Sequence, residues 1–203
     1  MLLPASCPVC GSLGSAPCPR CQASIGAPPP LPPPPGLTAC SAVMAYEGAG
    51  REIVARLKYR NARCVVPWLA TEMARLVQHP GDLRDPATGL AADVVTWVPT
   101  TAARRRERGF DQGRVLAVAV ARRLGIPCRG LLRRERGPAQ TGRSRRQRLE
   151  GPGYEVRSGR AVPPRVLLVD DVVTTGATLA AAAGRLREGG AHDVTALVAA
   201  RRP

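Results

Sequence analysis

Apolar and polar residues alternate along this chain in two periodicities that predict strands and helices in turn. Short apolar runs bounded by polar residues, glycine or proline indicate buried strands, whereas Ile53, Val54 and Leu57 are spaced along one face of a helix. The predicted strands are 41–46, 94–98, 166–170 and 193–199, and the predicted helices are 50–58, 65–78, 112–124 and 177–188. This alternation is typical of an α/β fold in which helices flank both faces of a mostly parallel sheet.

Local residues mark where two of these helices begin and end. Asp111 is a suitable N-cap for helix 112–124, and Gly125 would end that helix. Gly189 and Gly190 would close helix 177–188. Because ligands of such sheets bind at the carboxyl ends of the strands, we expect a site where strand 166–170 ends.

The segment 166–179, VLLVDDVVTTGATL, carries the most specific chemistry of the chain. Its strand ends in Asp170 and Asp171, which could hold sugar hydroxyls or a metal. The turn that follows comprises Thr174, Thr175, Gly176, Ala177 and Thr178. Since this turn precedes a helix, its backbone N–H groups and the positive end of the helix dipole favour a bound phosphate. The alternative is an ordinary strand–turn–helix whose acids lie at the surface.

Two common nucleotide-binding motifs are absent from the sequence. A P-loop requires a lysine after a glycine-rich run, but Lys58 is the only lysine and lies far from any such run. The glycine fingerprint of a Rossmann fold is also missing. The phosphate turn therefore belongs to another class of site.

The chain is strongly basic, and its charge is concentrated in one part of the sequence. It has 203 residues and a formal net charge of +15. Residues 101–150 contain 15 arginines and four acids, and so supply +11 of that total. This balance favours polyanionic partners or phosphorylated ligands. With only six aromatic residues, however, a base-stacking platform for single strands would be thin.

Four of the seven cysteines occur as two Cys-x-x-Cys pairs, Cys7 with Cys10 and Cys18 with Cys21. Two such pairs can direct four thiolates at one structural Zn²⁺, which would help so small a segment to fold. The alternatives are a thiol-redox pair or a degenerate remnant of a metal site. We see neither a signal peptide nor an apolar run that could span a membrane, and expect a cytoplasmic protein.

A proline-rich stretch divides the sequence into three parts. Residues 26–36, GAPPPLPPPPG, favour an extended polyproline II spacer over a helix or an inner strand. We therefore predict a zinc knuckle at 1–25, a linker at 26–37 and an α/β domain at 38–203.

Segment 166–179 resembles the phosphoribosyl pyrophosphate (PRPP) motif of type I phosphoribosyltransferases, and further matches make the chain similar to the ComF family of competence-associated, phosphoribosyltransferase-like proteins. The matches are the cysteine knuckle, Tyr46-Glu47-Gly48 with Leu57-Lys58-Tyr59-Arg60, Val98-Pro99 with Arg108-Gly109-Phe110-Asp111-Gln112, and Gln140 with Arg148. Asp111 stands where the family usually has Asn, and Gly151 where an Asn usually follows the basic stretch. An aspartate can still cap a helix, so the predicted fold is unaffected.

The resemblance implies a type I phosphoribosyltransferase fold that binds PRPP with Mg²⁺. It implies that residues 174–178 hold the 5′-phosphate, while Asp170 and Asp171 bind the ribose hydroxyls and act in catalysis. Lys58 and an arginine such as Arg108 would neutralise the pyrophosphate that leaves. Lys58 could instead be a solvated helix end, and the arginine clusters could be solvated surfaces.

Three functions remain open at this stage. The chain can be an active phosphoribosyltransferase, a pentosyl-transferring glycosyltransferase whose acceptor the sequence does not name. It can be a catalytically silent module that binds PRPP, single-stranded DNA or competence proteins in DNA uptake. It can also act in salvage or carbon-source metabolism, unrelated to DNA.

Overall fold

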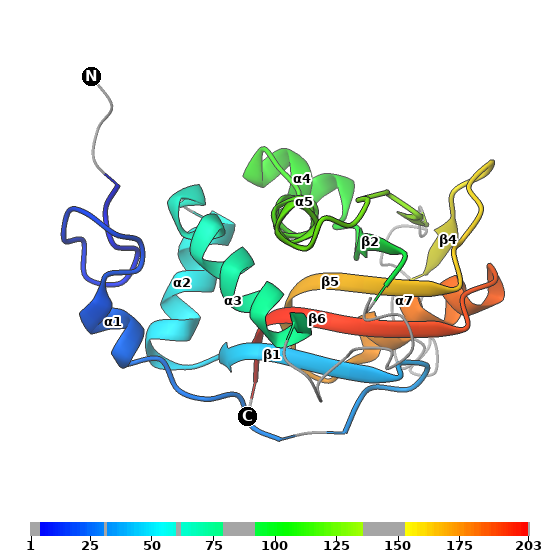
Figure 1. Cartoon of the computed structure of the whole chain (residues 1–203). Helices are drawn as coiled ribbons and strands as arrows, with labels where there is room; N and C mark the ends of the chain where they lie inside the picture. The colour runs from blue at the N-terminus through cyan, green and yellow to red at the C-terminus, as the bar shows by residue number, and fades with distance from the viewer. Residues whose placement is uncertain (1–4, 31, 60–61, 79–91, 136–152, 203) are drawn as a thin grey trace.

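A single parallel sheet forms the centre of the molecule (Figure 1). The computed structural model describes residues 5–30, 32–59, 62–78, 92–135 and 153–202. The strands of the sheet are β1 (Ala39–Ala45), β6 (Asp193–Arg201), β5 (Arg165–Val173) and β2 (Val94–Trp97), in that order. Every neighbouring pair runs parallel, which confirms the predicted α/β class.

Helices cover both faces of this sheet (Figure 1). One face carries α2 (Gly48–Tyr59), α3 (Val66–Gln78) and α5 (Gln112–Leu124), and the other carries α7 (Ala177–Glu188). Within β5, Leu167 and Val169 pack with the first group, whereas Val166 and Leu168 pack with the second. Because both sides of the strand are buried, its sequence is a continuous apolar run instead of an alternating one.

The acids of β5 lie in a different setting from the one predicted. The sequence places the end of the strand at Asp170, but β5 continues to Val173 because β6 pairs with it along that whole length. The pairing with β2 stops earlier, at Trp97 and Val169. Asp170 and Asp171 therefore lie inside β5, immediately beyond the point where β2 ends.

Several short elements have no counterpart in the sequence prediction. They are α1 (Pro19–Ala23), the 3-10 helix η1 (Arg63–Val65), α4 (Ala102–Arg108) and the antiparallel pair β3 (Leu132–Arg134) and β4 (Tyr154–Val156). Helix α4 buries none of its residues, so it has no apolar periodicity to detect. It is delimited by its caps: the Thr101 side chain accepts a hydrogen bond from the Arg104 N–H, and Gly109 is left-handed.

Helices α5 and α7 have the bounds that the sequence predicts. The Asp111 side chain accepts a hydrogen bond from the Arg114 backbone N–H, and Gly125 ends α5 with a φ of 68°. Helix α7 ends immediately before Gly189 and Gly190. In the part of the chain that the structure describes, no helix combines the length and apolarity needed to cross a membrane.

The proline-rich segment crosses the carboxyl edge of the sheet before it enters β1. The carbonyl of Gly26 accepts a hydrogen bond from the last residue of β1, and that of Pro29 accepts one from the last residue of β6. Further along, Pro34 lies against Gly176, and Leu37 is buried on the α7 side. Gly26 and Pro29 therefore contact the sheet directly, and the division of the chain at 26–37 stays a prediction.

Candidate functional site

The two acids of the predicted motif lie side by side on β5, and both are half-buried. The Asp170 carboxylate accepts a hydrogen bond of 2.8 Å from the backbone N–H of Asp171. Strand β6 pairs with β5 on both sides of Asp171, at Asp170 and at Val172, so the backbone that carries both acids is part of the sheet. This placement suits a precise binding site, because strands are more rigid than loops.

Lys58 reaches this pair from the last turn of α2. Its Nζ lies 2.9 Å from Oδ1 of Asp171, and only 16% of the lysine and 15% of the aspartate side chain are exposed. Of the two interpretations left open by the sequence, a solvated helix end is wrong for Lys58. Lys58 is the only lysine of the chain, and more than half the sequence separates it from Asp171. The structure thus brings two distant segments together.

A third carboxylate, from Asp111, contributes to the electrostatics of the site. Burial raises the pKa of Asp170 well above its usual value, and the charges of Asp171 and Asp111 raise it further, while Lys58 lowers it. Burial also raises the pKa of Asp111, although backbone N–H groups of Arg114 and Thr100 act against this. Negative charge is therefore crowded here, which favours cations and hydrogen-bond donors as ligands.

The turn predicted to bind a phosphate, residues 174–178, lies directly after β5 and leads into α7. Gly176 has a φ of 76° and is buried, whereas Thr174, Thr175 and Ala177 are exposed and Thr178 is half-buried. The start of the helix has no side-chain cap from its N-cap residue Gly176. The Ala177 N–H makes one long contact, 3.4 Å, with the Thr175 hydroxyl. Open N–H groups at a helix start are the donor set that a phosphate requires.

Two features require glycine at position 176: its positive φ, and the close approach of the proline-rich segment. A Cβ at this position would lie 2.5 Å from Cγ of Pro34. The prolyl ring therefore covers one side of the turn, and the exposed residues on either side of Gly176 leave another side accessible. Sequence reasoning treated the two segments separately and missed this contact.

Arg108, predicted to contact PRPP, packs on Tyr59, the residue that follows Lys58 in the sequence. Its guanidinium stacks 4.9 Å above the ring centre of Tyr59, and its Nη2 donates to the Tyr59 hydroxyl at 3.3 Å. Its Nη1 donates to Oε1 of Gln112 at 3.2 Å. Gln112 entered the sequence analysis only as part of a motif, and its burial at the start of α5 was not foreseen. Arg60, Gln140, Arg148 and Gly151 lie outside the described residues.

The four paired cysteines converge into one cluster. Their sulfur atoms all lie within 4.8 Å of one another, an arrangement that can hold a metal ion. Burial acts to raise the pKa of Cys7, but backbone N–H groups of Cys18, Cys10 and Val9 lower it to about 6. Burial and the neighbouring thiols raise the pKa of Cys21 to about 12. A bound cation would relieve the repulsion between thiolates in this cluster.

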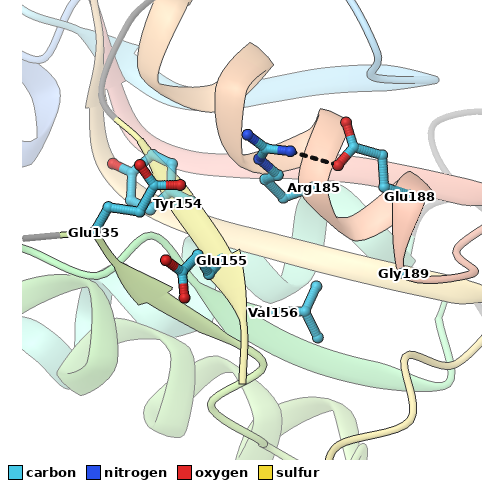
Figure 2. A pocket seen from close by; sticks show the side chains of 7 residues that line it. All are labelled: Glu135, Tyr154, Glu155, Val156, Arg185, Glu188 and Gly189. Carbon is cyan, nitrogen blue, oxygen red and sulfur yellow. Dashed lines mark hydrogen bonds and ion pairs between the residues drawn. The ribbon is translucent and has the colours of Figure 1, made fainter. Parts of the chain in front are cut away.

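A separate cavity of about 340 Å³ lies between β4 and the last turn of α7 (Figure 2). Glu135, Glu155 and Glu188 line it, and Arg185 forms an ion pair of 2.6 Å with Glu188. None of the predicted site residues lines this cavity. It is therefore distinct from the site at the carboxyl edge of the sheet.

Comparison with known proteins gives matches to one family. The family described as the phosphoribosyl transferase domain matches residues 111–203. Competence protein ComFC of Streptococcus pneumoniae is 37% identical over 99 residues, which cover 48% of this chain and 43% of that relative. The chain thus matches less than half the length of the curated relative.

Solved structures are similar over about two thirds of the chain. Glutamine PRPP amidotransferase from B. subtilis, complexed with ADP and GMP, shares 25% identity over 66% of this chain and 26% of that chain, with a TM-score of 0.45. Orotate phosphoribosyltransferase from Aeropyrum pernix shares 26% identity over 70% of this chain and 60% of that chain, with a TM-score of 0.40.

Proposed function

Because the chain is a ComF-family, type I phosphoribosyltransferase-like protein, we propose that it binds PRPP with Mg²⁺ at the carboxyl edge of its sheet. The observation that carries this proposal is the convergence of Asp170, Asp171 and Lys58 beside an open helix start. These groups supply, within one small region, partners for ribose hydroxyls, for a pyrophosphate and for a 5′-phosphate.

Each part of PRPP has a chemically matched partner in this site. The backbone N–H groups of residues 174–178, with the Thr175 and Thr178 hydroxyls, bind the 5′-phosphate. Asp170 and Asp171 accept hydrogen bonds from the 2′- and 3′-hydroxyls and favour positive charge at the anomeric carbon. When PRPP binds, the Lys58 ammonium exchanges its ion pair with Asp171 for one with the pyrophosphate and balances part of its negative charge.

The donor set at this edge fits Mg²⁺, which prefers oxygen ligands and keeps several waters. Asp170 and Asp171 offer carboxylate oxygens, and Asp111 adds negative charge nearby. A Mg²⁺ ion held there would neutralise part of the negative charge of the pyrophosphate. In transfer, the bond from the anomeric carbon to pyrophosphate breaks and the acceptor bonds to that carbon, while this chain stabilises the separating charges.

A paired substitution tests the binding proposal. Asp170→Asn with Asp171→Asn keeps the shape of both side chains and removes both charges, so calorimetry should detect no binding of PRPP with Mg²⁺. The matched control, Glu135→Gln with Glu155→Gln, removes two carboxylates from the separate cavity and should bind as wild type does. An unchanged affinity in the Asp170 and Asp171 variant would reject the assignment.

Whether the bound PRPP reacts is a separate question with its own experiment. We propose an active transferase, and a screen for pyrophosphate release with PRPP, Mg²⁺ and a set of nucleobases should identify the acceptor. Release with one base, and its loss in the Asp170 and Asp171 variant, is the expected result. Absence of release with every base would favour the second function.

The second candidate function is a catalytically silent, PRPP-binding module that contacts single-stranded DNA or competence proteins. The supporting observation is α4, whose Arg104, Arg105 and Arg106 are all exposed, and the charge of Arg105 acts to lower the pKa of Asp111 in the site. Binding of single-stranded DNA through these side chains should weaken steeply as salt increases, since phosphate contacts release counterions. DNA binding that is absent or independent of salt would reject this function.

We also propose that the cysteine cluster holds one structural Zn²⁺. Four thiolates complete a tetrahedral coordination and leave no position for a substrate, so the metal would stabilise the N-terminal fold. Val9, inside the first cysteine pair, and Ile25, shortly after the second pair, pack against the apolar residues of the α2 side. The metal therefore stabilises the attachment of the knuckle to the sheet domain.

A further inference from the structure

The proline-rich segment ends in a tight turn of residues 34–37, the proline turn, which lies against α7. The Leu37 N–H donates to the Pro34 carbonyl at 3.1 Å, and Gly36 has a φ of 82°. Proline followed by a left-handed glycine at the two central positions is typical of a type II turn. Leu37 is buried among the apolar residues of the α7 side. The proline turn therefore has a defined position on the sheet domain.

Helix α7 presents a face of small residues to the proline turn. A Cβ at Gly36 would lie 3.5 Å from Cβ of Ala183 and 4.0 Å from the carbonyl oxygen of Ala180. Gly176, Ala180 and Ala183 are spaced by four and three residues, so they lie along one face of the helix. Pro34 lies against Gly176, at the start of this face. The proline turn thus follows α7 from its middle to its N-cap.

Arg187, in the last turn of α7, holds the proline turn on this face. Its Nε donates to the Gly36 carbonyl at 2.6 Å, and its Nη2 donates to the Thr38 hydroxyl at 3.3 Å. Its Nη1 donates to the His192 carbonyl at 2.7 Å. One planar guanidinium therefore joins the residues that enter β1 to those that enter β6, and its rigid fork sets where Gly36 lies.

The residue that Pro34 contacts takes part in a hydrogen bond at the start of α7. The Gly176 carbonyl accepts a bond of 2.8 Å from the Ala180 N–H, and Gly176 has a φ of 76°. Glycine has more conformations open to it than any other residue, so its packing has to restrict it. The Pro34 ring supplies that restriction, because it leaves no room for a Cβ beside the Gly176 Cα.

We infer that Arg187 is a positioning residue for the turn of residues 174–178 and acts through the proline turn. It does not touch the phosphate, since Gly176 and Arg187 are 11 residues apart, roughly 16 Å along the helix. By fixing Gly36 it seats Pro34 on Gly176, which holds the N–H groups of residues 174–178 in one orientation. A site that is ordered before binding loses less entropy when its ligand arrives. The inference rests on the proposed function and adds two residues that lie outside the PRPP motif.

Three variants and one control test this series of contacts. Arg187→Gln removes the charged fork, Pro34→Ala removes the ring that lies against Gly176, and a double variant combines both changes. Arg185→Gln is the matched control, because Arg185 lies in the same turn of α7 but pairs with Glu188 at the separate cavity (Figure 2). Calorimetry in the presence of Mg²⁺ measures the affinity of each protein for ribose 5-phosphate and for inorganic pyrophosphate, below the temperature at which unfolding begins.

The expected result is selective and non-additive. Affinity for ribose 5-phosphate should fall roughly fivefold in each single variant, the loss that one hydrogen bond represents, while affinity for pyrophosphate stays unchanged. The double variant should lose no more than the larger single loss, since both substitutions break one series of contacts. Arg185→Gln should bind both ligands as wild type does. Additive losses, equal losses for both ligands, the same loss in Arg185→Gln, or unchanged ribose 5-phosphate affinity in either single variant would overturn the inference.

A measurement without ligand separates this inference from the PRPP proposal. Amide hydrogen exchange at Ala180 reports on its bond to the Gly176 carbonyl, and should be severalfold faster in both single variants than in wild type or Arg185→Gln. Faster exchange in a protein whose wild type binds no ribose 5-phosphate supports the positioning role and rejects the PRPP proposal. Unchanged exchange and affinity, in a protein that binds ribose 5-phosphate, support the PRPP proposal and reject the positioning role. Arg187→Lys, which keeps a charged donor, replaces Arg187→Gln in both measurements if the latter does not fold.

Discussion

Nζ of Lys58 lies 2.9 Å from Oδ1 of Asp171, so an ion pair joins the end of α2 to the strand that carries both acids. Both side chains are largely withdrawn from water. Removing one partner of such a pair lowers stability by more than the intact pair contributes, because the remaining charge is left buried and unpaired. In the ligand-free protein, Lys58 thus compensates part of the charge that Asp170 and Asp171 concentrate on β5.

Replacement of Lys58 by methionine should weaken both folding and PRPP binding. The free energy of unfolding should fall by about 1–3 kcal/mol, less than for a fully buried pair because both groups keep some contact with water. Denaturant unfolding measures this, and adding Asp171→Asn should restore part of the loss. Lys58→Arg, which keeps the charge, is the control, and equal stability of Lys58→Met and wild type would show that the pair contributes nothing.

Replacement of Asp170 by asparagine should stabilise the protein at neutral pH while it removes PRPP binding. Burial and Asp171 raise the pKa of Asp170, so its contribution to stability is fully present below the ordinary aspartate pKa, about 3.9, and is lost as pH rises through the higher folded value. Asparagine avoids that loss. The gain in Tm should therefore be visible at neutral pH and vanish in acid.

Asp93 provides a control of opposite sign for this pH dependence. The Arg165 side chain lowers the pKa of Asp93, whose carboxylate accepts hydrogen bonds of 3.0 and 2.7 Å from Arg165 at the other end of the sheet. Its contribution is present above the ordinary aspartate pKa and is lost as pH falls through the folded value. Asp93→Asn should lower Tm at neutral pH, and a lower Tm for Asp170→Asn as well would contradict the prediction.

Substitution of Gly176 by alanine should damage the phosphate turn for two separable reasons. The positive φ costs about 1–2 kcal/mol for a residue with a Cβ, and the new methyl group would overlap Pro34. Gly125→Ala shares the positive φ but meets no atom within 4 Å, so it measures the backbone cost alone. Adding Pro34→Gly to Gly176→Ala should recover the steric part.

The same variants measure the link between the turn and the ligand. Affinity for ribose 5-phosphate should fall in Gly176→Ala, recover in part with Pro34→Gly, and remain unchanged in Gly125→Ala. If Gly176→Ala and Gly125→Ala are equally destabilised and both bind ribose 5-phosphate normally, the contact with Pro34 has no role in shaping the turn.

The cysteine cluster should contain one Zn²⁺ per chain in the purified protein. Cys7→Ser removes one of four ligands, so metal content measured by mass spectrometry should fall and the Tm should decrease. Cys64→Ser is the control, because Cys64 is exposed and lies outside the cluster. Full metal content in Cys7→Ser, or none in the wild-type protein, would contradict the zinc assignment.

The longer helices and strands that bury one side were predictable from the sequence, whereas the short elements and the exposed helix α4 were not. Strand β5 and helix α5 carry an apolar run and a capped apolar face, which are local properties. Helix α4 buries nothing, so its existence depends on the caps at Thr101 and Gly109. The extension of β5 beyond Asp170 depends on pairing with β6, which no local pattern encodes.

The sequence by itself determined the parallel α/β architecture, the acids and phosphate turn of residues 166–179, and the paired cysteines, because each depends on residue types at short spacing. Only the tertiary structure decided that Lys58 faces Asp171, that Pro34 covers Gly176, and that Arg187 bonds to Gly36. The physical reason is that these contacts join segments far apart in the chain, or depend on burial. Contacts between distant segments and the burial of side chains are both set by how the helices pack on the sheet, and the spacing of residues in the sequence does not specify that packing.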